Sequence, residues 1–327
     1  MATLNLFDLL PPSANGSHHV AAPGGYESWN FHAHDPAHNL RLCIGFHDGY
    51  ILHPNYVRRF NAYRRRPTRN APPVPAQFPC LVASVYEGRK RVAGSTIQYR
   101  VGSFHCTDKT NRLDSNRIDF CAGKIAIELS GQPISGKLEL LPTFSLTIEK
   151  QFPAVESRAI EHHWLCTPIC RASGQIHIAS RNVSFDGMGQ HNHYYGSGPP
   201  SSTARRWMRG QILFPRAAVN FQAADDRTLI LASDESGVRQ IDDSPMLANW
   251  DRHSIWSLPY PSTIDFGRWL ILRNPRIAAH SPANLELLYD AYVDGQQTAA
   301  WVEIDYPNCL RGFHQAWMMR RRFSTSS

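Results

Sequence analysis

The chain has 327 residues, of which 42% are hydrophobic, 11% aromatic and 19% charged, with a formal net charge of +7. The charged fraction lies below the roughly 25% usual for globular proteins, which excludes a disordered chain, an acidic tail protein and a coiled coil. No apolar run approaches the roughly 18 residues of a transmembrane helix, and residues 1–20 lack the basic and apolar regions of a signal peptide. We therefore expect a cytoplasmic protein.

Alternation of apolar and polar residues with a period of two predicts most of the regular structure, because it places apolar side chains on one face of a strand. In chain order, the pattern occurs at residues 40–46, 125–129, 144–148, 175–179, 211–214, 228–232, 269–272, 285–293 and 299–304. The dipeptides Glu87-Gly88, Ser130-Gly131 and Ser173-Gly174 predict turns. Many short strands at such spacing are typical of sandwiches and closed barrels, so the predicted fold class is all-β.

One short amphipathic helix is predicted after Pro54, where Tyr56, Phe60 and Tyr63 recur at helical spacing. Its other face and the loop that follows are rich in arginine: Arg58, Arg59, Arg64, Arg65, Arg66 and Arg69. No nucleic-acid recognition motif accompanies these arginines, so we expect no nucleic-acid partner. A solvated surface and peripheral contact with an anionic membrane surface both remain open.

The most unusual stretch runs from Phe185 to Gly196 and is dense in glycine and hydrogen-bonding side chains. On a strand, His191 and His193 point to one face and Asn192 to the other. The stretch has two interpretations: a polar strand end whose histidines are satisfied by neighbours, or a group of donors and proton carriers at a cavity mouth.

No metal or cofactor site is predicted. His32, His34 and His38 lie close together around Asp35, but their spacing does not match a metallo-hydrolase pattern. Nucleophile-elbow, dinucleotide-binding and phosphate-loop motifs are absent from the sequence.

The order of several short motifs resembles the carotenoid 1,2-hydratase (hydroxyneurosporene synthase) family, which includes lipocalin-like virulence homologues and fungal Diels–Alderases. The similarity runs from about residue 26 to residue 320. The matching positions are Glu27 and Trp29, His163, Trp164 and Pro168, the stretch from Gly187 to Gly196, Trp207 and Gly210, and Glu303.

The resemblance implies two lipocalin-like antiparallel β-barrel domains packed side by side. We expect an N-terminal extension over residues 1–23, an N-terminal domain over 24–195 and a C-terminal domain over 196–327. The Gly-, Ser- and Pro-rich region 187–203 is the clearest break in the sequence between two halves.

The resemblance also implies cofactor-independent addition of water to a C=C bond of an apolar isoprenoid or polyene. Three positions depart from the family pattern: Gln190 replaces a tyrosine, Asn192 an aspartate and Tyr194 an asparagine. The aspartate is the acid expected in the hydratases, and an amide cannot replace it. A hydratase would then need its acid elsewhere, at Glu303, Glu27, Asp186 or an imidazolium of His191 or His193.

Two other functions stay open. A cyclase or pericyclase needs a folded substrate and neutral donors rather than an acid. A barrel of this class can also bind a lipophilic ligand without catalysis. For all three functions the predicted partner is an apolar small molecule.

The predicted site residues are expected to line one enclosed pocket. The catalytic candidates are His191, Asn192, His193, Tyr195 and Glu303, and the substrate-binding candidates are Trp29, Trp164, Gln190, Tyr194 and Trp207.

Overall fold

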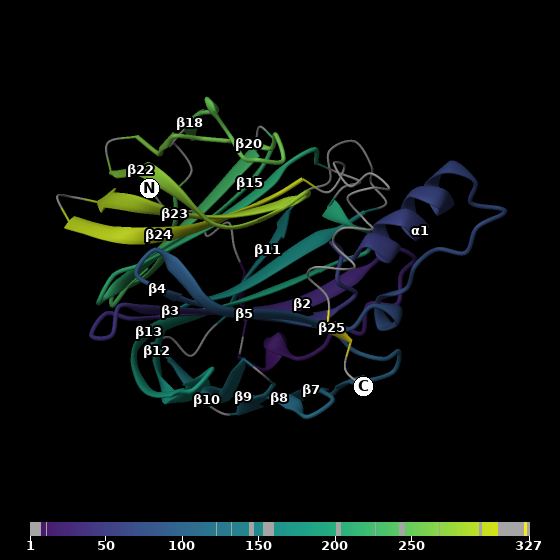
Figure 1. The fold of residues 1–327 in the computed structure, drawn as a ribbon, viewed down its shortest axis with the longest axis horizontal. Helices are drawn as coiled ribbons and strands as arrows, with labels where there is room; N and C mark the ends of the chain where they lie inside the picture. Colours follow the sequence, from purple (N-terminus) through teal and green to yellow (C-terminus); the bar gives the residue numbers. More distant parts are fainter. Residues whose placement is uncertain are drawn as a thin grey trace. The chain divides into compact units, whose positions relative to one another are not determined.

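The protein is almost entirely β-structure, as a computed structural model shows (Figure 1). The structure describes residues 8–10, 12–121, 123–131, 133–143, 147–152, 160–200, 204–225, 227–241, 246–267, 269–293, 296–306 and 324–325. Among these residues, no helix is both long and apolar enough to cross a membrane. The described chain divides into two compact units, which we call the first unit (residues 8–200 and 324–325) and the second unit (residues 204–306).

The first unit is built on one curled sheet of 14 strands, and its central order is β5-β4-β3-β2-β13-β12-β10-β9-β8. All pairs are antiparallel except β25 with β5. Its strands are β1 Asp8–Leu10, β2 Tyr26–Asp35, β3 Leu40–Asp48, β4 Cys80–Glu87, β5 Lys90–Gln98, β6 Phe104–Cys106, β7 Thr110–Leu113, β8 Asn116–Cys121, β9 Lys124–Ser130, β10 Ile134–Pro142, β11 Thr147–Phe152, β12 His162–Ile178, β13 Arg181–Gly196 and β25 Ser324–Thr325. Its helices are the short 3-10 turns η1 Pro12–Asn15 and η2 Pro75–Gln77, and α1 Pro54–Arg65.

The long β12–β13 hairpin lies in the middle of the sheet of the first unit. The predicted turn at Ser173-Gly174 is wrong: both residues lie inside β12, where Gly174 is opposite Leu138 on one side and Phe185 on the other. A Cβ atom at Gly174 would lie 2.1 Å from the carbonyl oxygen of Lys137. The glycine therefore permits close approach of two strands rather than a reversal of the chain.

The turns at Glu87-Gly88 and Ser130-Gly131 are confirmed at the ends of β4 and β9.

The predicted helix after Pro54 is confirmed as α1. Pro54 occupies its first turn, where the missing N–H costs nothing, and the His53 side chain caps it by accepting a hydrogen bond from the Asn55 backbone N–H at 3.1 Å. Tyr56, Val57 and Phe60 are buried on one face.

The second unit contains a nine-stranded antiparallel sheet in the order β17-β16-β15-β14-β24-β23-β22-β21-β18 and a separate β19–β20 pair. Its strands are β14 Trp207–Leu213, β15 Ala217–Ala224, β16 Arg227–Asp234, β17 Gly237–Gln240, β18 Leu247–Asn249, β19 Arg252–His253, β20 Pro259–Tyr260, β21 Thr263–Asp265, β22 Leu270–Ser281, β23 Asn284–Val293 and β24 Gln296–Asp305. A separate apolar cluster, which includes Ile212, Phe221 and Val302, forms its core.

The predicted all-β fold class with two curled antiparallel sheets is confirmed. The strands predicted from alternation at residues 40–46, 125–129, 228–232, 285–293 and 299–304 all lie within β3, β9, β16, β23 and β24. The strand predicted at 144–148 lies partly outside the described residues.

Candidate functional site: a buried carboxyl and histidine cluster

Three neighbouring strands of the first unit bring the polar residues of the candidate site together. Glu27 on β2 lies directly opposite Asp48 on β3 and Tyr195 on β13. His193 pairs in the same way with Trp29. Since directly opposed residues of antiparallel strands share a face, all five side chains belong to one face of the sheet. This is the inner face, which carries the core residues Trp29, Phe31 and Phe46.

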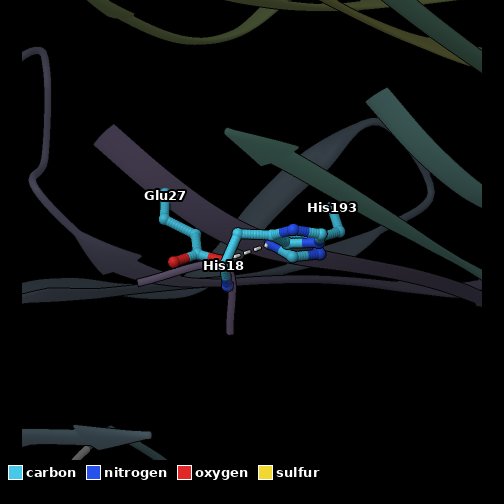
Figure 2. Close-up of side chains that lie close together, drawn as sticks. All are labelled: His18, Glu27 and His193. Carbon is cyan, nitrogen blue, oxygen red and sulfur yellow. Dashed lines mark hydrogen bonds and ion pairs between the residues drawn. The ribbon is translucent and has the colours of Figure 1, made fainter. Parts of the chain in front are cut away.

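Glu27 is the centre of the cluster (Figure 2). One carboxyl oxygen lies 2.9 Å from His193 Nε2 and accepts a hydrogen bond from the backbone N–H of His18 at 2.7 Å. The other oxygen accepts a hydrogen bond from the Ser17 hydroxyl at 3.0 Å. Burial raises the pKa of Glu27, and the contacts with His18 and Ser17 oppose this shift. The carboxyl is therefore oriented by three neighbours while it is largely removed from water.

Asp48 is the second carboxyl of the cluster. Burial, together with the negative charge of Glu27 opposite, raises the pKa of Asp48 to about 7. Its Oδ1 atom is buried and has no hydrogen-bond partner among the described residues. Two buried carboxyl groups directly opposite each other disfavour the ionisation of both at once.

The segment before β2 completes the cluster. The ring of His18 is exposed and stacks on Tyr195 with a centroid distance of 3.9 Å. The indole N–H of Trp29 donates to the backbone oxygen of Asn15 at 2.8 Å. Ser17 and His18 fall within the predicted N-terminal extension and carry no motif, so sequence reasoning missed them; only the contacts with Glu27 reveal them.

Aromatic rings continue from this cluster into the core of the first unit. His193 stacks on Trp29 at a centroid distance of 4.7 Å, and His191 stacks on Phe31 at 4.6 Å. His191 is fully buried, and neither of its ring nitrogens has a hydrogen-bond partner among the described residues. An apolar group that reached this position would meet aromatic faces beside a neutral imidazole.

The buried state of His191 makes a testable contribution to stability. Burial, and secondarily the nearby His193, holds the pKa of His191 well below its usual 6.5. Below about pH 6.5 the unfolded chain takes up a proton at His191 that the folded chain does not. This protonation of the unfolded chain lowers the free energy of unfolding as the pH falls. In urea titrations between pH 6.5 and 5, we expect His191→Asn to reduce the slope of unfolding free energy against pH by about 0.7 kcal/mol per pH unit near pH 6.5, rising to about 1.4 kcal/mol per pH unit near pH 5. His105→Asn, at an exposed position, is the control, and equal slopes for His191→Asn and the parent protein would contradict the prediction.

The other predicted residues of the first unit lie on the opposite, outer face of the same strands. The Trp164 indole N–H donates to Asn192 Oδ1 at 2.8 Å, and Tyr194 stacks near Trp164. Gln190 and Asn192 are fully buried. The Gln190 amide and Asn192 Nδ2 have no hydrogen-bond partner among the described residues. This face therefore offers neutral amide groups rather than acids.

Trp207 and Glu303 belong to the second unit, on the face opposite its core. The Trp207 indole N–H donates to Gln222 Oε1 at 3.1 Å. Glu303 pairs with Arg209 at 2.8 Å and accepts a hydrogen bond from the Asn284 amide at 2.8 Å. Burial raises the pKa of Glu303, and the guanidinium of Arg209 opposes this shift.

The predicted site residues are thus divided into three groups. The inner face of the first unit holds Trp29, His191, His193 and Tyr195, and its outer face holds Trp164, Gln190, Asn192 and Tyr194. Trp207 and Glu303 lie in the second unit. That all of them line one pocket stays a prediction. Asp186, a proposed alternative acid, is largely exposed and lies 3.4 Å from Arg171.

One group of potential metal ligands occurs in the described part of the chain. The ligand atoms of His18, Glu27 and His193 all lie within 4.8 Å of one another. Two imidazoles and a carboxylate are a donor set that suits Zn²⁺. In contrast, His38 of the histidine group at residues 32–38 contacts Asp35 at 2.7 Å, and this pair closes the β2–β3 turn. The expectation of a metal-free protein stays a prediction.

Comparisons with known proteins define the fold of this chain. No family model matches it, and no curated protein matches its sequence. The crystal structure of an AttH protein from Nitrosomonas europaea matches with a TM-score of 0.62 and 13% identity, over 90% of this chain and 96% of that one. Kievitone hydratase from Nectria haematococca matches with a TM-score of 0.54 and 10% identity, over 94% and 95% of the two chains.

A third solved structure, CghA with Sch210972, matches with a TM-score of 0.51 and 10% identity, over 91% of this chain and 97% of that one. The three neighbours are all of one lipocalin-like family. At these identities the likeness establishes the fold, and the predicted lipocalin-like architecture is confirmed.

Proposed function

We propose that this protein is a cofactor-independent hydratase that adds water to a C=C bond of an apolar isoprenoid or polyene. The single observation that carries the proposal is the Glu27–Asp48 carboxyl pair on the inner face of the first unit, beside His193 and a series of aromatic rings. The pKa of Asp48, raised to about 7, supports a proton donor that is matched to neutral pH. The structural similarity to a kievitone hydratase is consistent with this function.

The reaction would proceed in two steps. Asp48 donates its proton to one alkene carbon, which leaves a tertiary carbocation at the other carbon. A water molecule then attacks the cation and passes a proton to the imidazole of His193, which Glu27 orients through its 2.9 Å contact. Transfer of that proton through the Glu27–Asp48 pair restores the starting state.

In this mechanism the amide of Asn192 is not the missing acid. Its Oδ1 accepts a hydrogen bond from Trp164 on the outer face, away from the carboxyl pair. The acid that the family resemblance assigns to position 192 on β13 would instead come from β3, which β2 separates from β13 in the sheet.

A cyclase is the second candidate, and one observation favours it. The buried Nε2 of Gln190 and Nδ2 of Asn192 have no partner among the described residues, and they are neutral donors of the kind that polarise a carbonyl during ring closure. This alternative places the chemistry on the outer face of the first unit.

Incubation with a linear terpenoid or carotenoid in oxygen-18 water distinguishes the candidate functions. We expect a product that contains one labelled hydroxyl group, because water is the nucleophile in the proposed reaction. An unlabelled isomer of unchanged mass would support the cyclase, and recovery of intact substrate from a tight complex would support a binding protein. Either of these results would contradict the hydratase.

A further inference from the structure

The arginines of α1 and of the turn that follows it form a separate feature from the carboxyl cluster. The arginine face comprises Arg58, Arg59, Arg64, Arg65, Arg66 and Arg69, and all six side chains are exposed. No Asp or Glu occurs between Asp48 and Glu87 in the sequence. None of the six arginines forms an ion pair with a carboxylate of the described residues, and Arg59 donates only to the side chain of Gln77.

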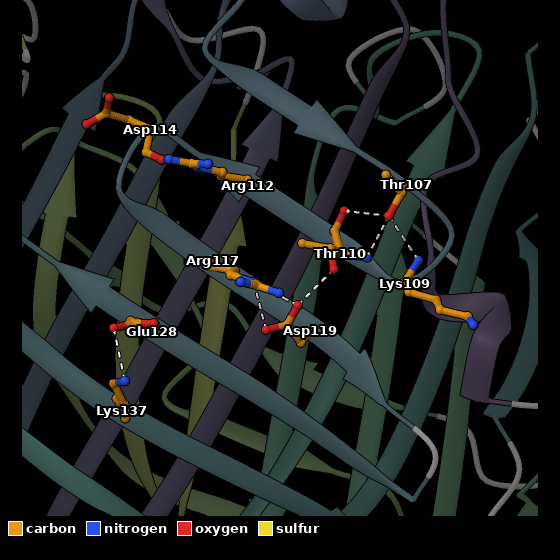
Figure 3. Close-up of polar contacts among 9 residues, drawn as sticks. All are labelled: Thr107, Lys109, Thr110, Arg112, Asp114, Arg117, Asp119, Glu128 and Lys137. Atoms are coloured by element: carbon orange, nitrogen blue, oxygen red, sulfur yellow. Dashed lines mark hydrogen bonds and ion pairs between the residues drawn. The ribbon is translucent and has the colours of Figure 1, made fainter.

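Basic residues elsewhere in the first unit behave differently. On the strands β7 to β10, Arg117 pairs with Asp119 at 2.8 Å and Lys137 pairs with Glu128 at 3.2 Å (Figure 3). Arg112 donates to the backbone oxygen of Asp114 at 2.9 Å. The local charge of that surface is largely balanced, whereas the charge of the arginine face is not.

We infer that the arginine face binds the surface of a membrane that contains anionic phospholipid. Guanidinium groups form paired hydrogen bonds with phosphate oxygens, and each basic residue near an anionic bilayer strengthens the association. The apolar side of the helix is already occupied, since Tyr56 and Phe60 are buried. The contact would therefore be electrostatic and reversible, with the helix lying on the headgroups rather than inserted among the lipid tails.

The same observations favour lipid over nucleic acid. A single-stranded nucleic-acid site combines basic residues with aromatic rings on which bases stack. The aromatic rings of Tyr56 and Phe60 face the protein instead and Tyr63 is half-buried, so all the fully exposed side chains of α1 are arginines. A membrane surface would also bring the protein to an apolar substrate, although this advantage depends on the proposed function.

Vesicle flotation tests the inference with the full-length protein. We expect the protein to float with vesicles of phosphatidylcholine and phosphatidylglycerol, to remain in solution with phosphatidylcholine alone, and to be released as the salt concentration rises. The triple variant Arg58→Gln, Arg65→Gln, Arg69→Gln should lower the partition coefficient for anionic vesicles by about 100-fold, as expected for the loss of three surface cations.

The matched control is Arg112→Gln, Arg117→Gln, Lys137→Gln, which removes the same number of charges from the balanced surface. Equal losses for the two triple variants would show an effect of net charge alone and would overturn the inference. Equal flotation with both vesicle types, or arginine-dependent binding to duplex DNA without vesicle binding, would also overturn it. Because turnover of detergent-dispersed substrate needs no membrane, failure here is distinguishable from failure of the proposed hydratase.

Discussion

Replacing Asp48 by Asn is expected to lower the rate of hydration by about 10²- to 10⁴-fold, which is the usual contribution of a positioned general acid. The amide has nearly the same shape as the carboxyl group but cannot supply a proton. The loss should fall on kcat rather than on KM, because Asp48 acts on the reacting carbon and contributes little to the binding of an apolar substrate. Label incorporation from oxygen-18 water under saturating substrate measures this effect.

The control for this substitution is Asp186→Asn, which changes a carboxyl group on the same unit that is largely exposed. It should leave the rate within about twofold of the parent protein, in line with the small effects of most surface substitutions. Asn192→Asp, which restores the acid of the family pattern on the outer face, should not increase hydration. An Asp48→Asn protein with full activity, or an Asn192→Asp protein with clearly higher activity, would show that Asp48 is not the general acid.

The pH profile gives a second readout of the same pair. The acid must be protonated, so activity should decline as the pH rises through about 7, the raised pKa of Asp48. Part of that shift comes from the charge of Glu27. In Glu27→Gln this charge is removed, which lowers the pKa of Asp48. The decline in activity should therefore occur at a lower pH than in the parent protein. A merely structural role for Glu27 would lower activity without moving the profile.

Replacing Trp29 by Ala is expected to destabilise the first unit by about 3–5 kcal/mol, the cost usual for removal of a fully buried large aromatic side chain. Trp29 has no exposed surface, stacks on His193 and Phe104, and donates a hydrogen bond to the backbone oxygen of Asn15. Its loss removes both the packing beneath the carboxyl cluster and the anchor of the segment that carries Ser17 and His18. Urea denaturation followed by circular dichroism measures the change in unfolding free energy.

The variant Trp29→Phe separates the two contributions. It retains an aromatic ring against His193 but loses the indole N–H, so we expect a smaller loss of about 1–3 kcal/mol. A Trp29→Ala protein as stable as the parent, or equal losses in both variants, would contradict the assigned role of the ring in the core.

Period-two alternation and helical spacing predict part of the local structure of this protein, including β3, β9, β16, β23, β24 and α1. Residues 40–46 alternate because β3 has one face in the core, and Tyr56 and Phe60 recur at helical spacing because α1 buries one side. The same rule correctly separated His191 and His193 from Asn192 on β13. It failed at Ser173-Gly174, because a glycine required for close strand approach has the same sequence pattern as a glycine in a turn.

The all-β class, the helix, the assignment of side chains to strand faces and the arginine-rich segment can be inferred from sequence, since each depends on residues close together in the chain. Which charged groups meet depends on the packing of distant strands. Glu27 and His193 are separated by 166 positions and come within 2.9 Å through the pairing of β2 with β13. Asp48 joins them through the β2–β3 register, and Ser17 and His18 through a segment without regular structure. The pKa values that make this cluster a candidate acid depend on burial and on neighbouring charge, and both arise only when distant strands pack together.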